Sequence, residues 1–225
     1  MSNNQTGKYF KYAIGEILLV VIGILIALQI NNWNEGRKDR IKEATILKQI
    51  NLDFKSNKRQ LDSIKINNDK VIAGCDVILS MMPFKKEQAT ADTLFKYMPI
   101  VMNVKTFNPS NGTIEALISS SSFEVIQNDS LRNLLVSWKD RYVDFSEEEQ
   151  YARDFQIWQL GPYWRENFDF IGGFSDSNME QMVKPQFMNL WFDKRQSVLE
   201  VQNAIRDEGI ERYINEIIRL TEDYD

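Results

Sequence analysis

The sequence has no histidine and a single cysteine, Cys75, among its 225 residues. Histidine is the commonest general base and the commonest metal ligand in proteins, so both kinds of histidine site are excluded. One cysteine excludes a disulfide within the chain and a zinc site built from thiolates. Cys75 lies at helical spacing from neighbouring apolar residues, so we predict that its thiol is buried and structural.

Motifs that carry catalysis are also missing. Gly172-Gly173 lacks the spacing and the preceding strand of a phosphate-binding loop, and the serine run 119–122 has no histidine to activate it. The run Glu147-Glu148-Glu149 is interpreted as a solvated helix face, not as a metal site. We therefore predict a protein that is not an enzyme, with no catalytic, cofactor-binding or metal-binding residues and no cofactor.

The charge pattern lacks a basic face. The 27 Lys and Arg are outnumbered by 32 Asp and Glu, and the two signs are interspersed along the chain. Nucleic-acid-binding proteins normally show a basic surface, so no nucleic acid is expected as a partner. The hydrophobic share of 43% and the charged share of 26% are typical of a folded globular protein.

A long apolar run is present near the N-terminus. Residues 13–30 read AIGEILLVVIGILIALQI, in which only Glu16 and Gln29 are polar. About 20 apolar residues span the core of a bilayer. Aromatic residues flank the run, as in the interfacial belts of membrane proteins: Tyr9, Phe10, Tyr12 and Trp33. We predict a transmembrane helix over 13–32 after a short tail, 1–12; a cleaved signal peptide fits less well because no small-residue cleavage site follows.

Three residues of this segment are candidates for helix–helix association. At 100° per residue, Glu16, Gly23 and Ala27 fall on one face of the helix. Gly23 and Ala27 form a pair of small residues that lets a second helix approach closely. A carboxylate in the span is costly unless it is paired or reaches the headgroups, so Glu16 is expected either to snorkel or to bond a partner helix.

The rest of the chain, 33–225, is predicted to be a helical extramembrane domain. Apolar residues recur at three- and four-residue steps over about 37–82, 130–160 and 193–222, and strand-like alternation is scarce. Asn128-Asp129-Ser130 is a capping cluster for the second of these helices, and Gly161-Pro162 is expected to end it. The fold class is therefore all-α, with the transmembrane helix continuing into, or followed by, a long stalk helix packed in a helical bundle.

Aromatic residues concentrate in the middle of the chain. These residues are Trp138, Trp158, Tyr163, Trp164, Phe168, Phe170 and Phe174. We expect them to pack in the protein core, and a ligand cage is the alternative.

Two segments resemble a bacterial domain-of-unknown-function family of small single-pass membrane proteins. The likeness is carried by residues 8–35, KYFKYAIGEILLVVIGILIALQINNWNE, and by residues 108–138, NPSNGTIEALISSSSFEVIQNDSLRNLLVSW. The resemblance implies membrane anchoring and brings no assigned activity or site residue. The expected location is a bacterial inner membrane.

The charges that flank the apolar run do not decide on which side of the membrane the large domain lies. A count of Lys and Arg places the large domain in the cytoplasm, whereas the acid-free N-terminal tail with Lys8 and Lys11 fits a signal anchor with the domain in the periplasm. The periplasmic orientation is favoured.

Three function classes remain. The favoured one is a membrane-anchored structural or interaction protein, whose partners are the lipid bilayer and either further copies of itself or another membrane protein. The alternative is a ligand-binding or sensor module acting through a partner, and the third is an enzyme using carboxylates. The sequence identifies no ligand, specific partner or physiological process.

Overall fold

The predicted all-α fold is confirmed. The computed structural model describes residues 6–169, 175–207 and 209–224, and no strand occurs in these ranges. The first helix, α1 (Thr6–Ser80), contains the apolar run, and further helices follow it. By internal contacts the chain divides within α1 into an N-terminal unit, 1–47, and a bundle unit, 48–225, and each is described by itself.

The N-terminal unit is helical from Thr6 onward, and the apolar side chains of its run 13–30 are exposed. From Ile14 to Ile30 every large apolar side chain is at least 43% exposed. The helix has a stretch with a mean hydropathy of 2.6, none of it buried, and by length and composition this stretch suffices to cross a membrane.

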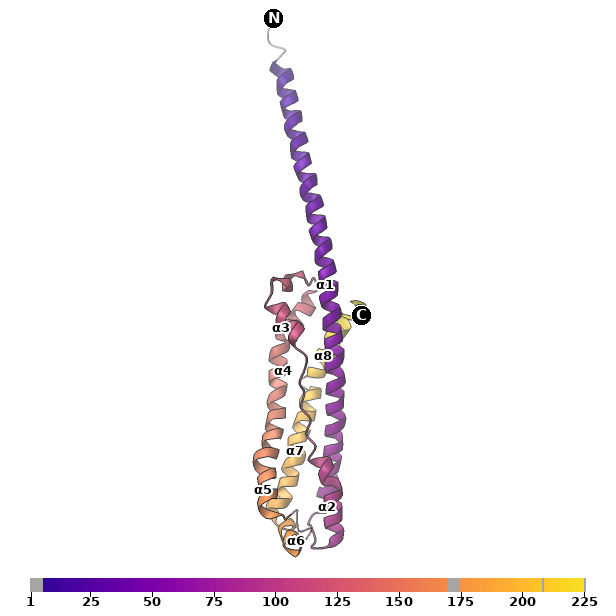
Figure 1. The fold of residues 1–225 in the computed structure, drawn as a ribbon, viewed down its shortest axis with the longest axis vertical. Helices are drawn as coiled ribbons and strands as arrows, with labels where there is room; N and C mark the ends of the chain where they lie inside the picture. The colour runs from indigo at the N-terminus through magenta and orange to yellow at the C-terminus, as the bar shows by residue number, and fades with distance from the viewer. Residues whose placement is uncertain (1–5, 170–174, 208, 225) are drawn as a thin grey trace. The chain divides into compact units, whose positions relative to one another are not determined.

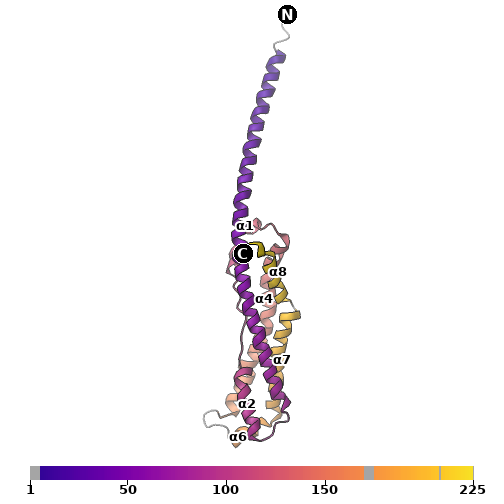
Figure 2. The same ribbon diagram turned by 90° about the vertical axis from the view of Figure 1, so that its right-hand side faces the viewer.

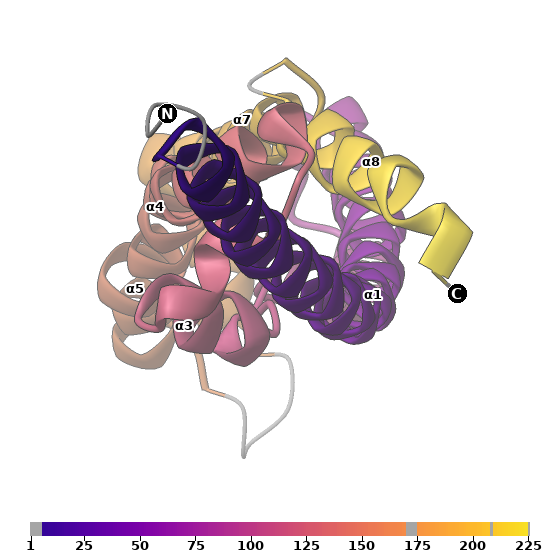
Figure 3. The same ribbon diagram turned by 90° about the horizontal axis from the view of Figure 1, so that it is seen from above.

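The bundle unit is built on three long helical segments: the second part of α1, α4 (Asp129–Phe155) and α7 (Pro185–Asp207). They run side by side in Figures 1 and 2. The shorter elements are α2 (Gln88–Val101), α3 (Gly112–Ile118), α5 (Gly161–Asn167), α6 (Asp176–Met182), α8 (Ile210–Leu220), the 3-10 helices η1 (Ser121–Val125) and η3 (Glu222–Tyr224), and the π-helix η2 (Gln156–Leu160). Seen from above in Figure 3, α8 lies beside α1 and α7.

The start of α4 follows from its capping residue. The Asn128 side chain accepts a hydrogen bond from the backbone N–H of Leu131, which otherwise has no partner in the first turn. The expected end at Gly161-Pro162 does not occur, because the chain stays helical through η2 and α5 to Asn167. Pro162 lies in the first turn of α5, where the missing N–H of proline costs little.

The C-terminal helical region is two helices instead of one continuous helix over 193–222. Helix α7 ends at Asp207 and α8 begins at Ile210, and Gly209 between them has a φ of +82°. This left-handed conformation is strained for residues with a Cβ atom, so glycine at this position permits the break.

The aromatic middle of the chain is largely core. Trp138, Tyr163, Trp164 and Phe168 are buried, and Trp164 packs against Phe187 with ring centroids 5.3 Å apart. Trp158 is the exception, because it is 72% exposed. Phe170 and Phe174 lie outside the described residues.

Candidate functional site: buried polar groups of the bundle unit

A buried carboxylate, Glu149, fixes the segment that connects α2 to α3. Both of its oxygens accept from the backbone N–H of Phe107 at 3.0 Å. Burial raises the pKa of Glu149 to about 7, although the Phe107 hydrogen bond and the charge of Arg153 oppose the rise. The interpretation of Glu147-Glu148-Glu149 as a solvated face is therefore wrong for Glu149, which is 7% exposed.

A buried amine, Lys194, lies on α7. Its side chain is fully buried, and its Nζ donates to Oε1 of Gln156 at 2.6 Å. Burial lowers the pKa of Lys194 to about 8, because the charged form loses its hydration. Gln156 in turn donates from Nε2 to the carbonyl of Met102 at 2.9 Å. The amide of Gln156 thus connects α7 to the segment after α2.

Gln156 is the first residue of the π-helix η2. A single-turn π-helix adds one residue within an α-helix and is frequent at functional sites. Here the polar side chain of Gln156 points inward to Lys194, whereas Ile157 and Trp158 are exposed. Lys194 lies seven residues after the buried Phe187 and four before the buried Val198, a helical spacing that the prediction did not use. No comparable signal points to Gln156.

Glu149, Lys194, Asn68 and Asn103 share the lining of a small cavity of about 20 Å³. This volume matches one water molecule and is far below what a metabolite or an organic cofactor requires. The buried Nδ2 of Asn68 has no hydrogen-bond partner within the described chain, so the cavity has the polar lining that an ordered water needs. The arrangement can hold a water and position the chain; it offers no space for a substrate.

Cys75 is buried, as predicted. Burial raises the pKa of the Cys75 thiol to about 11, so the thiol stays protonated and unreactive at neutral pH. Among the described residues no group of three or more cysteine or carboxylate side chains is placed to hold a metal ion.

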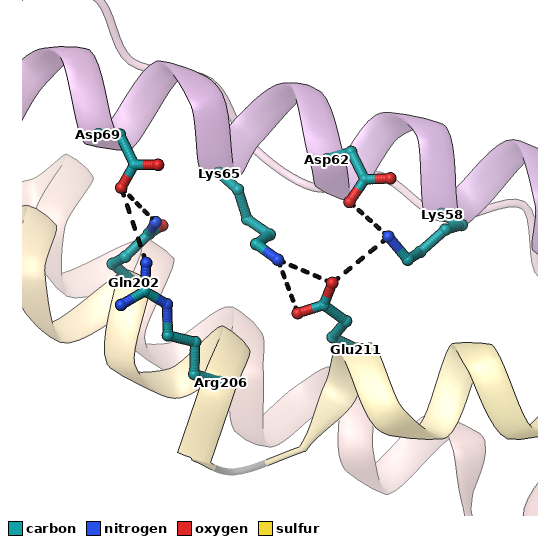
Figure 4. Close-up of polar contacts among 7 residues, drawn as sticks. All are labelled: Lys58, Asp62, Lys65, Asp69, Gln202, Arg206 and Glu211. Atoms are coloured by element: carbon teal, nitrogen blue, oxygen red, sulfur yellow. Dashed lines mark hydrogen bonds and ion pairs between the residues drawn. The ribbon is translucent and has the colours of Figure 1, made fainter.

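An ion-pair network joins α1 to α7 and α8. Figure 4 shows Glu211 of α8 between two lysines of α1, with its Oε1 2.7 Å from Nζ of Lys65 and 3.3 Å from Nζ of Lys58. On the other side of the α7–α8 break, Asp69 accepts from Gln202 at 2.7 Å. The network therefore attaches both sides of the break at Gly209 to the same helix. Its charged groups are paired with one another, which is typical of a structural contact.

The three candidate residues of the apolar segment lie on α1 in the N-terminal unit. Glu16, Gly23 and Ala27 are exposed, and a Cβ atom added at Gly23 would meet nothing within 4 Å. The face is therefore uncovered within the described chain, which leaves its predicted association as a proposal.

One family matches the chain. The family is described as a family of unknown function (DUF6090), and its model matches residues 16–153. This range contains all of the second segment on which the sequence resemblance was based, and most of the first. No curated protein and no solved structure matches the chain.

Proposed function

The chain belongs to DUF6090, a family of unknown function, and from its geometry we propose a membrane-anchored interaction protein without catalytic activity. In this proposal residues 13–32 cross a bilayer, and the helical domain of 33–225 binds a protein partner outside it.

The observation that carries the proposal is the exposed apolar surface of the N-terminal unit. Apolar side chains surround the helix on all sides, for example Leu19 at 71%, Leu25 at 59% and Ile30 at 61% exposure. A surface of this kind needs an apolar environment, since soluble monomers rarely expose large contiguous apolar patches. Trp33, 64% exposed, follows the run where an interfacial aromatic residue is expected.

Transfer energies support insertion. Between residues 14 and 30 there are twelve Ile, Leu and Val side chains. Each favours insertion by ~0.3–0.6 kcal/mol, so together they contribute about 4 to 7 kcal/mol. Glu16 opposes insertion by roughly 3 kcal/mol if it lies at the centre of the bilayer, and by less near the headgroups. The apolar side chains therefore outweigh the single carboxylate.

Within the membrane, the proposed contact face is formed by Glu16, Gly23 and Ala27. Gly23→Leu would fill the space that a second helix needs, and Glu16→Gln would remove the charge from the face. A photoreactive residue at Val20, on the same face, is expected to cross-link to a partner helix. We expect each substitution to lower the yield at least ~5-fold, the change that corresponds to about 1 kcal/mol of association energy.

Gly15→Leu is the matched control, because it makes the same change about 80° away around the helix. Its cross-linking yield is expected to equal that of the unchanged protein. Unchanged yields for both Gly23→Leu and Glu16→Gln would refute the contact.

The proposed location is a bacterial inner membrane, with the large domain in the periplasm. The acid-free tail with Lys8 and Lys11 supports this orientation, as does the tolerance of long domains for translocation. A reporter fused after Asp225 that is active only in the periplasm is expected to be active. Activity of a cytoplasm-specific reporter at the same position would instead show the opposite orientation.

The ligand-binding alternative has less support. The cavity at Glu149 and Lys194 accommodates a single water. Of the aromatic candidates for a cage, Tyr163, Trp164 and Phe168 pack against one another. Protein–protein contact thus agrees better with the described surfaces.

A further inference from the structure

A basic face lies on the outer side of α1 in the bundle unit. Arg59, Ile66 and Lys70 are separated by seven and four residues, so they share one side of the helix, and all three are exposed. With Lys105 they line an open groove of about 500 Å³. The one acid in this groove, Asp62, is paired with Lys58, so the groove keeps a net positive charge. Within the described residues neither Arg59 nor Lys70 has an ion-pair partner.

An acidic face lies on the outer side of α4. Asp140, Asp144, Glu147 and Tyr151 follow one another at three- and four-residue steps, and all four are exposed. Val143 on the same face is 42% exposed and Tyr151 is 62% exposed. Asp140 and Glu147 have no ion-pair partner in the part of the chain that the structure describes, and Asp144 has only a 3.8 Å contact with Arg141.

The two faces lie at the same height of the bundle. The rings of Phe54 and Trp138 touch, with centroids 4.9 Å apart, and Asn68 and Ala152 line one cavity. In both pairs the α4 residue lies 84 positions after the α1 residue, and the two helices run in the same direction (Figure 1). With the same offset, Arg59 lies level with Val143 in the acidic face. Lys70 lies level with the end of that face, just after Tyr151.

The two faces point away from each other. Phe54 and Trp138 direct the core sides of α1 and α4 toward one another, and the charged faces lie on the outer sides of the same helices. The basic face of one molecule can thus meet only the acidic face of another molecule, not its own.

We propose that bundle units of two copies of this chain bind side by side, with the basic face of α1 from one copy against the acidic face of α4 from the next. The proposal names the partner within the interaction role proposed above and rests on that role. The contact joins two different faces, so the assembly keeps one unused face of each sign, a basic face at one end and an acidic face at the other. Because the faces lie at equal height, parallel copies can make the contact without a shift along the bundle, as required for copies anchored in one bilayer.

The opposite charges of the two faces favour this contact over other orientations of two copies. The chain has a formal net charge of −5, so two copies repel each other at most relative orientations. Placing Arg59, Lys70 and Lys105 against the acids of α4 converts this repulsion to attraction, and Ile66, Val143 and Tyr151 add apolar area.

The test uses charge reversal in the full-length protein in mild detergent, with Gly23→Leu present throughout to remove the contact proposed for the membrane segment. The α1 variant carries Arg59→Glu and Lys70→Glu, and the α4 variant carries Asp144→Lys and Glu147→Lys. Mass by light scattering at low salt is expected to show oligomers of the parent protein. Each variant alone is expected to associate at least ~10-fold more weakly.

Mixing the two variants tests whether the two faces bind each other. The α1 variant keeps its acidic face and the α4 variant keeps its basic face, and the two reversed faces are also opposite in sign. The mixture is therefore expected to regain the association that each variant alone has lost. Lys85→Glu with Lys184→Glu is the control for the α1 variant, because it makes the same change in net charge at two exposed lysines outside both faces. The control should associate like the parent protein.

A monomeric parent protein, unchanged association of either variant, or a mixture without pairs would each overturn the proposal. Membrane fractionation of the same variants reports anchoring separately. If the proteins stay in the membrane fraction but the variants do not associate as expected, the lateral contact is refuted and the membrane anchor is not. Loss of the parent protein itself from the membrane would instead refute the proposed function.

Discussion

Replacing Val21 and Leu25 with arginine is expected to move the protein from the membrane fraction to the soluble fraction. Each arginine at the centre of a bilayer costs ~2.5–3.5 kcal/mol and also removes the gain of the apolar side chain it replaces. The double substitution thus shifts the insertion energy by about 6 to 8 kcal/mol, which equals or exceeds the whole favourable contribution of the apolar run. The measurement is resistance to alkaline carbonate extraction of membranes from expressing cells.

The positions are chosen to leave the other proposed contact intact. Val21 and Leu25 lie on the side of the helix opposite Gly23 and Ala27, so the loss of a partner helix does not explain the result. Ile41→Arg with Leu52→Arg is the control, because both side chains are exposed but lie outside 13–32. An arginine variant that still resists extraction would show that another part of the chain, or a bound partner, holds the protein in the membrane.

Replacing Lys194 with methionine is expected to change how the stability of the bundle unit depends on pH. Methionine keeps most of the apolar stem and removes the buried amine. At pH 7 the buried ammonium costs about 3 kcal/mol, the free energy that corresponds to lowering its pKa from 10.5 to about 8. The variant loses this cost but leaves Oε1 of Gln156 without its donor, which costs roughly 1–3 kcal/mol.

The sign of the pH effect follows from proton binding. Between pH 8 and 10.5 the unfolded chain keeps a proton on Lys194 that the folded chain has lost, so rising pH favours the folded state. The unchanged protein gains this stability and the variant does not. We therefore expect Lys194→Met to be at least as stable at pH 7 and less stable at pH 10, with the difference changing by about 3 kcal/mol.

Urea unfolding of the full chain in mild detergent, followed by tryptophan fluorescence, measures this difference. Other titrating groups, including Cys75, are present in both proteins and largely cancel in the comparison. Lys184→Met is the control, since Lys184 is exposed. Parallel pH profiles for the parent and Lys194→Met proteins would show that the amine is hydrated in the folded state.

Local signals in the sequence predicted the helical class and several specific features. The Asn128 cap rests on interactions within one turn, and the burial of Cys75 follows from the apolar stripe of a single helix. The apolar run of residues 13–30 is equally local. These features need no knowledge of which helix packs against which.

Features that depend on tertiary packing were missed. Glu149 was assigned to a solvated face, because its neighbours Glu147 and Glu148 suggest one; its partner, the N–H of Phe107, lies 42 positions away. The hydrogen-bond partner of the buried Lys194 amine, Gln156, lies 38 positions away. Pro162 was expected to stop a helix, but the first turn of α5 tolerates it.

The π-helix η2 has a consequence for the periodicity of α4 and α5. It acts as a one-residue insertion, so the apolar phase that runs through α4 is shifted by about 100° in α5. This shift explains why Trp158, which fits the apolar spacing of α4, is exposed, while Leu160 and Tyr163 face the core. A family member with one residue fewer between 155 and 161 would keep a continuous α-helix but turn Gln156 away from its lysine. We expect family members with this deletion to have an apolar residue at the position of Lys194.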